Sequence, residues 1–183
     1  MRNTLRFLLV FVVVLIVVAG PLSAENRKGI RFGYIESKLD KGSAGIFDNG
    51  YTSFYVGFFN DQKIIPMIWF SSGLDYYQSG SKKSDDAKLT LHYISVPLAL
   101  KVKLGPVRGF GGLHGAVKVS SKITLGGQSE SAKDFSSFDA GAFLGGGIQI
   151  LFIAAEFKYN WGLVDLYNGY KNNFWQAGLT LSF

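Results

Sequence analysis

Apolar residues alternate with polar or small residues along most of the chain after its first two dozen positions. Over residues 94–104 an apolar side chain falls at every second position, and Lys101 and Lys103 lie between them. Residues 153–161 repeat this pattern, with Glu156 and Lys158 in the polar phase. Successive side chains of a β-strand point to opposite faces, so this period of two predicts strands with one apolar and one polar face.

Eight such strands are predicted. They are expected near residues 28–36, 51–59, 64–77, 88–104, 107–119, 137–150, 153–163 and 173–183. Several have the roughly 9 to 11 residues that a tilted strand needs to cross a bilayer.

The predicted connections alternate between long and short. The long ones cover residues 37–50, 78–87, 120–136 and 164–172, and the short ones cover residues 60–63, 105–106 and 151–152. Transmembrane barrels have short periplasmic turns and long outer loops, with an even number of strands. The long segments, such as residues 78–86, are rich in Gly, Ser, Lys and Asp, and we expect them to be mobile and water-exposed.

A sheet with an apolar, lipid-facing surface has to close on itself, because hydrocarbon offers no partner to the free N–H and C=O groups of an open edge. Eight strands leave an interior that side chains can fill. The fold class expected is therefore all-β, an eight-stranded antiparallel up-and-down transmembrane β-barrel with a side-chain-filled lumen.

The first 24 residues have the features of a secretory signal peptide. Arg2 and Arg6 flank a polar start, residues 7–18 form an unbroken apolar run, and small residues follow, with cleavage expected after Ala24 or after Gly20. A retained anchor helix is the alternative, but the run is shorter than the roughly 20 apolar residues that a spanning helix needs. We therefore assign residues 1–24 to a signal peptide and residues 25–183 to a barrel in the outer membrane.

Composition agrees with a lipid-facing surface. Only 17% of the 183 residues are charged, against about a quarter in soluble domains. The chain has no cysteine, which excludes disulfides and an acylated cysteine. Its formal charge of +6 falls by two without the arginines of the leader, so nucleic acid is not expected as a partner.

Charged residues in the polar phase are expected to face the lumen. These are Arg31, Lys101, Lys103, Asp139, Glu156 and Lys158. Buried charges need partners, so we expect ion pairs that plug the lumen and stabilise the barrel. A charged path for a small solute is the alternative.

Enzymatic residues are few. His92 and His114 could form a hydrolase dyad or triad with Ser95, Ser120 or Ser121, but no nucleophile motif accompanies them. A metal site would need carboxylates from other strands. We therefore expect no catalytic residue, no metal and no cofactor. The three tryptophans are expected in interfacial aromatic belts, and they are Trp69, Trp161 and Trp175.

The last strand resembles the C-terminal recognition strand of Gram-negative outer-membrane barrels. Its in-phase residues end on an aromatic ring, and they include Trp175, Leu179, Leu181 and Phe183. This resemblance implies that the barrel assembly machinery reads the strand.

Further motifs resemble those of PorT-like barrel proteins, within the broader class of OmpX/OmpA-type eight-stranded barrels. Residues 93–105 match a "Y-x-x-x-P-L-x-x-K" strand, followed by Gly-Phe-Gly-Gly at residues 109–112, and residues 159–163 match "Y-x-x-G-L". The resemblance implies the barrel fold. Some PorT-like members belong to a secretion apparatus.

The function expected is a non-enzymatic role through outer loops or envelope partners, in adhesion, envelope integrity or assembly of a secretion complex. The expected partners are outer-membrane lipid, the barrel assembly machinery and proteins at the outer loops. Three alternatives stay open: a narrow channel for small solutes, a lipid hydrolase, and a soluble exported barrel that holds an apolar ligand.

Overall fold

The computed structural model describes residues 26–40, 49–84, 87–125, 128–131, 137–165 and 171–183. The predicted signal peptide lies outside these residues. The strands are β1 (Asn26–Asp40), β2 (Asn49–Ile65), β3 (Ile68–Ser84), β4 (Ala87–Leu104), β5 (Val107–Leu125), β6 (Gln128–Ser131), β7 (Phe138–Ile150), β8 (Ile153–Gly162) and β9 (Lys171–Ser182).

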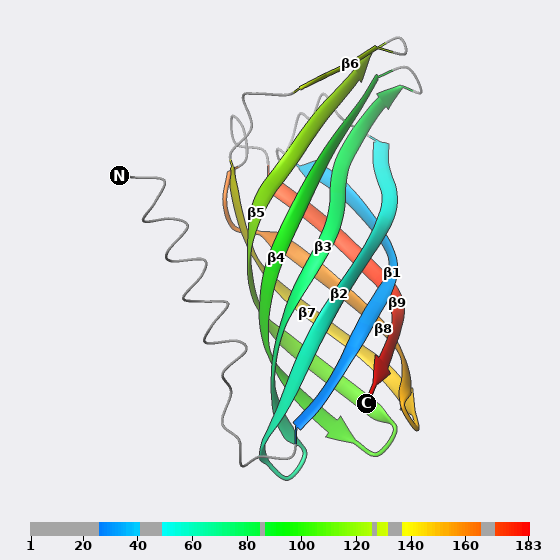
Figure 1. The fold of residues 1–183 in the computed structure, drawn as a ribbon, viewed down its shortest axis with the longest axis vertical. Coiled ribbons are helices and arrows are strands. Elements are labelled where there is room, and N and C mark those ends of the chain that lie inside the picture. The colour runs from blue at the N-terminus through cyan, green and yellow to red at the C-terminus, as the bar shows by residue number, and fades with distance from the viewer. Residues whose placement is uncertain (1–25, 41–48, 85–86, 126–127, 132–136, 166–170) are drawn as a thin grey trace, which may run out of the picture.

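The sheet closes into a barrel of eight long antiparallel strands (Figure 1). The hydrogen-bonded order is β4-β3-β2-β1-β9-β8-β7-β5, and β4 also pairs with β5. The seam between β1 and β9 runs from Gly29 opposite Ser182 to Asp40 opposite Lys171. The predicted eight-stranded antiparallel barrel is confirmed.

The short strand β6 was not predicted. It lies within the segment expected to be the third long loop and pairs with the end of β5, from Lys122 opposite Ser131 to Leu125 opposite Gln128. The hairpin extends beyond the body of the barrel (Figure 1).

Three tight turns lie at the end of the barrel where β1 begins and β9 ends. Their central residues are Pro66-Met67, Gly105-Pro106 and Leu151-Phe152. Met67, Gly105 and Leu151 have positive φ angles of 71°, 61° and 55°. Two-residue hairpin turns use such left-handed positions to match the twist of the strands.

The turn predicted at residues 60–63 is wrong. These residues continue β2, and the chain reverses at Pro66-Met67. The polar run is typical of a turn, but the side chain of Asp61 points into the lumen, where it binds two lysines. Asp61 was expected to be exposed to water in a turn, but it lies in a buried ion pair instead.

Strands at the opposite end run further than predicted. Residues 78–84, expected in a mobile loop, belong to β3. Ser79 is buried and donates to Asn172 Oδ1 at 2.6 Å, and the Gly80 N–H donates to Ser37 Oγ at 2.8 Å. Polar side chains here satisfy one another across the lumen, which extends the barrel.

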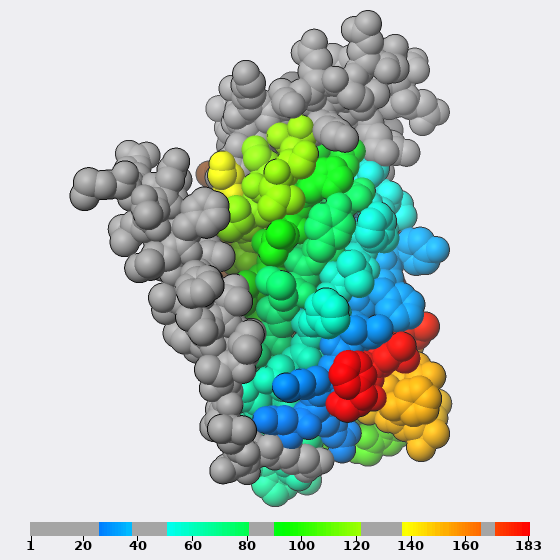
Figure 2. Space-filling model, viewed as in Figure 1, coloured from blue at the N-terminus to red at the C-terminus, as the bar shows by residue number. Residues whose placement is uncertain are grey.

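The outer face carries the apolar phase of each strand. Phe58, Leu113 and Leu144 are 64%, 60% and 61% exposed. Figure 2 shows side chains of neighbouring strands forming a continuous wall on one side of the barrel. The predicted alternation of lipid-facing and lumen-facing residues is confirmed.

Across the described ranges, no helix is both long and apolar enough to cross a membrane.

Candidate functional site

One row of the sheet brings an ion pair together across three strands. Gly57 of β2 lies opposite Arg31 of β1 on one side and opposite Asp75 of β3 on the other. Arg31 Nε donates to Asp75 Oδ1 at 2.7 Å, and Lys158 Nζ lies 3.9 Å from Asp75 Oδ2. A Cβ at Gly57 would collide with the Asp75 carboxylate. The glycine therefore gives the pair its space.

A second ion cluster forms around Asp61. Lys101 Nζ lies 2.9 Å from Asp61 Oδ1, and Lys103 Nζ lies 3.2 Å from Asp61 Oδ2. The Lys101 ammonium also lies 4.8 Å and 5.9 Å from the ring centroids of Phe59 and Phe110. Aromatic faces stabilise a cation at these distances, so Lys101 is held on several sides.

A third pair joins β5 to β8. Arg108 Nε lies 3.1 Å from Glu156 Oε1, and Thr180 Oγ1 donates to Glu156 Oε2 at 2.7 Å. Arg108 also donates to Gln149 at 3.4 Å. This cluster lies at the level where β5 leaves its turn.

Asp139 lies in a separate polar network. Asn172 Nδ2 donates to Asp139 Oδ2 at 2.9 Å, and Ser79 donates to the Oδ1 of the same asparagine. Asp139 thus accepts a hydrogen bond from an amide, whereas the other five predicted lumen residues lie in ion pairs.

Sequence reasoning missed three members of the ion clusters, namely Asp61, Asp75 and Arg108. Asp75 lies in the polar phase of its predicted strand, so the alternation indicated that it faces the lumen. Asp61 was placed in a turn, and Arg108 lies two positions after the turn predicted at residues 105–106. Their partners depend on the register between strands, which the alternation does not fix.

The described side chains leave little free space in the middle of the lumen. The cavity there measures ≈ 20 Å³, and its lining includes Arg31, Tyr55, Phe110, Glu156 and Lys158. A volume of about 10 to 15 Å³ is needed to hold one water molecule. The cavity thus has room for about one water.

The mouth at the short-turn end is open and basic. It forms a basin of ≈ 500 Å³ with Trp69 at its wall, together with Arg27, Lys63, Lys103 and Gln149. Arg27 Cζ, Lys63 Nζ and Lys103 Nζ lie 5.2 Å, 5.7 Å and 4.1 Å from the Trp69 ring centroid. We call this feature the basic basin.

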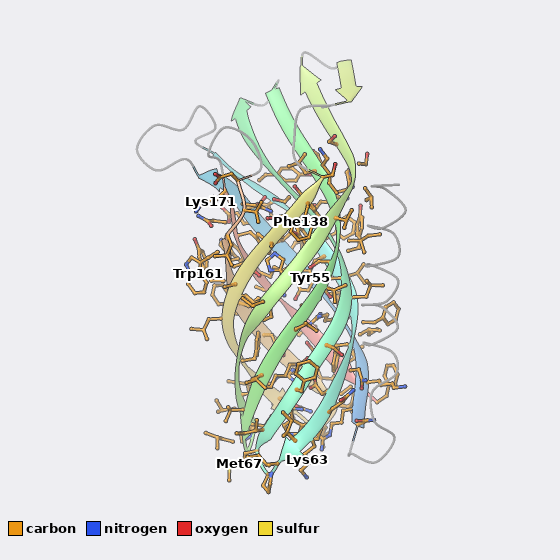
Figure 3. The ribbon with its side chains drawn as sticks, turned by 90° about the vertical axis from the view of Figure 1, so that its left-hand side faces the viewer. Tyr55, Lys63, Met67, Phe138, Trp161 and Lys171 are labelled. Carbon is orange, nitrogen blue, oxygen red and sulfur yellow. The ribbon has the colours of Figure 1, made fainter. Side chains whose placement is uncertain are left out.

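The placement of Trp69 in an interfacial belt is wrong. Its side chain faces inward and is only 4% exposed. Three cations surround the ring, which explains why it lies inside. Trp161 is 44% exposed and points away from the barrel (Figure 3), and Trp175 packs against Phe157 with centroids 6.0 Å apart.

The two histidines lie in different surroundings. His114 is buried, with ring centroids 6.3 Å from Phe143 and 5.9 Å from Phe174. His92 Nδ1 lies 2.7 Å from the hydroxyl of Tyr76. In the part of the chain that the structure describes, no group of three or more His, Asp and Glu side chains is arranged to hold a metal.

The residues of the proposed assembly signal lie on β9 and just after it. Leu179 is 42% exposed and Phe183 is 81% exposed. The Phe183 N–H donates to the Lys28 carbonyl at 2.8 Å, and Lys28 returns a bond of 3.1 Å to the Phe183 carbonyl. The backbone of the last residue thus takes part in the seam with β1.

Comparison with known proteins gives one family. The family model described as "Outer membrane protein beta-barrel domain" matches residues 25–168. No curated protein matches the chain.

Solved structures of small barrels share the fold. Ail, the attachment invasion locus protein of Yersinia pestis, is 17% identical with a TM-score of 0.55, covering 87% of this chain and 99% of its own. The same protein in complex with the heparin analogue sucrose octasulfate gives 19% identity and a TM-score of 0.56, over 87% and 99% of the two chains. Neisserial surface protein A is 14% identical with a TM-score of 0.56, covering 86% and 97%.

Proposed function

The chain belongs to the family of outer-membrane protein β-barrel domains, and from this premise we propose that it acts without catalysis, through its outer loops or through partners in the envelope. It is an integral outer-membrane protein. Export by a cleaved signal peptide at residues 1–24 is part of the proposal.

The packing of charged side chains in the lumen carries this proposal. Five basic and three acidic side chains fill the described interior with ion pairs, and the central cavity of ≈ 20 Å³ is far below the volume of a hydrated ion path. In a barrel whose lumen is filled and whose outer wall faces lipid, the two ends are the surfaces that can bind partner proteins. Adhesion, envelope integrity and assembly of a secretion complex are the roles that use those ends.

Two features favour particular forms of this role. The motifs at residues 93–105 and 159–163 favour a PorT-like protein and hence assembly of a secretion complex. The fold is shared with Ail, the attachment invasion locus protein of Yersinia pestis, and is compatible with adhesion through the outer loops. Outer-membrane lipid is the proposed partner of the apolar belt, and the barrel assembly machinery that of β9.

Heat-modifiable migration and conductance test the proposal together. The chain from residue 25 onward is refolded into detergent and compared, boiled and unboiled, by gel electrophoresis, then added to planar bilayers. We expect a heat shift and no conductance steps. Migration without a heat shift would contradict the closed barrel, and steady conductance would support the narrow channel instead.

The hydrolase alternative has a separate test. The refolded barrel is incubated with phospholipid vesicles, and release of fatty acid is measured for the unaltered protein and for H92A and H114A. We expect background release from all three. Release that falls in either variant would establish a membrane hydrolase.

A further inference from the structure

The central cavity is lined by side chains of the two seam strands and of strands beyond them. Arg31 of β1 and Gln176 of β9 both line it, together with Tyr55, Ser71 and Lys158 of β2, β3 and β8. Tyr55 lies well inside the barrel, between its two ends (Figure 3). The volume of ≈ 20 Å³ exceeds the about 10 to 15 Å³ that one water molecule needs.

Arg31 has a hydrogen-bond donor without a partner. Its Nε donates to Asp75 Oδ1 at 2.7 Å, whereas its Nη2 has no hydrogen-bond partner among the described residues. Arg31 is 9% exposed, so bulk water does not satisfy this group. A buried donor without an acceptor costs free energy, and native structures usually supply it with a protein group or an ordered water.

Gln176 has an acceptor without a partner. Its Oε1 accepts no hydrogen bond from the described residues, and the residue is 2% exposed. In the seam, Gln176 lies opposite Ile35 and Arg31 lies opposite Thr180, so the two side chains reach the cavity from different levels. A donor and an acceptor therefore line the same cavity without a bond between them.

Lys158 supplies a further donor to this cavity. Its Nζ lies 3.9 Å from Asp75 Oδ2 and 5.0 Å from the ring centroid of Phe143. A hydrogen bond from nitrogen to oxygen spans about 2.7 to 3.2 Å, so the ammonium is attracted to Asp75 without donating to it. Because an ammonium donates in several directions, Lys158 can also donate to a ligand in the cavity.

The polar groups of the lining decide the kind of ligand. A water molecule can accept from Arg31 and Lys158 and donate to Gln176, and buried waters make about three hydrogen bonds of this kind. A halide only accepts, so it would leave the Gln176 oxygen without a donor. The carboxylate of Glu156, which belongs to the same lining, would also repel an anion.

We propose that the central cavity binds one water molecule, which accepts hydrogen bonds from Arg31 and Lys158 and donates one to Gln176. The water ties β1, β8 and β9 together inside the seam, next to the ion pair between Arg31 and Asp75. The lumen is then filled by a bound ligand as well as by ion pairs.

Crystals of the barrel grown in sodium bromide test the inference. The chain from residue 25 onward is refolded in detergent, and the ordinary electron density is compared with the anomalous difference map, which reveals bromide. We expect one peak in the cavity, about 2.7 to 3.2 Å from Arg31 Nη2 and Gln176 Oε1, without anomalous signal. An anomalous peak at this place would overturn the assignment to water, and an empty cavity would overturn the site.

Leucine at position 176 removes the acceptor at a similar side-chain size. The Q176L barrel should therefore lack the peak, and a peak that persists there would overturn the role of Gln176. The matched control is Q78L, because the amide of Gln78 bonds to Ser53 and Tyr76 and does not line the cavity. The Q78L barrel should keep the peak, and its loss from both variants would contradict the assignment to Gln176.

Both variants are checked for the heat shift before crystallisation, so that the peak is compared between folded barrels. If Q176L does not fold, the density of the unaltered barrel decides the inference. Conductance is measured separately, and a barrel that stays silent while its cavity is empty overturns this inference and leaves the proposed function standing.

Discussion

Arg31 Nε lies 2.7 Å from Asp75 Oδ1, and this ion pair joins β1 to β3 across the inner face of β2. Gly57, the residue of β2 in the same row, has no side chain to separate them. Lys158 approaches the same carboxylate from β8 at 3.9 Å. Asp75 is therefore the point at which three strands are tied together inside the barrel.

Replacing Asp75 with asparagine should destabilise the barrel strongly. Arg31 and Lys158 would stay buried without their carboxylate, and breaking a buried pair from one side costs about 3 to 5 kcal/mol. The free energy of unfolding is measured by urea titration in lipid vesicles. D165N, which changes an exposed aspartate, should stay within about 0.5 kcal/mol of the unaltered protein. Equal effects of both changes would contradict the role of Asp75.

Adding a methyl group at Gly57 should also lower stability. Its Cβ would meet the Asp75 carboxylate and, at 2.8 Å, the Leu74 carbonyl. Such overpacking costs about 1 to 3 kcal/mol. G109A is the matched control, because a Cβ at Gly109 meets nothing within 4 Å. The free energy of unfolding is again measured by urea titration. A G57A barrel as stable as the G109A barrel would show that there is room for a methyl group between Arg31 and Asp75.

Substitutions at two of the turns should change the free energy of unfolding in opposite directions. Leu151 adopts a φ of 55°, and Gly105 a φ of 61°. Left-handed conformations cost a non-glycine residue about 1 to 2 kcal/mol. L151G should therefore raise the free energy of unfolding by about 1 kcal/mol, while G105A should lower it by a similar amount. Shifts in the same direction for both variants would contradict the turn geometry.

The three tryptophans should report different surroundings. Each variant keeps one tryptophan and replaces the other two with phenylalanine, and quenching by brominated phospholipids is measured after reconstitution. Trp161 and Trp175 should be quenched, since their rings lie on the outer face. Trp69 should be protected, because its ring is 4% exposed and surrounded by cations. Strong quenching of Trp69 would place it in the lipid instead.

The sequence predicted the barrel because lipid and lumen demand different side chains at successive positions. Over residues 94–104 this contrast is complete, and strand, face and turn all follow from it. A prediction from this contrast fails where one residue type suits two surroundings. Asp61 fits a turn as well as an ion pair, and Trp69 fits a membrane interface as well as a ring of cations.

The alternation of apolar and polar residues could not predict which charges form ion pairs, and the reason is different. Which charges meet depends on the stagger of the strands, since Arg31 and Asp75 are 44 residues apart and two strands apart. A period of two gives the face of a residue but not its height in the barrel. The basic basin likewise arises only when the ends of β1, β2, β3 and β4 are brought to one level.

The seam between β1 and β9 also governs the order of folding. Its paired residues, such as Asp40 and Lys171, are separated by nearly the whole barrel sequence, and contacts between such distant segments form slowly because a long loop must close first. Until β9 arrives, β1 presents an unpaired edge that invites aggregation. Pairing of β9 with β1 therefore removes the last open edge of the sheet.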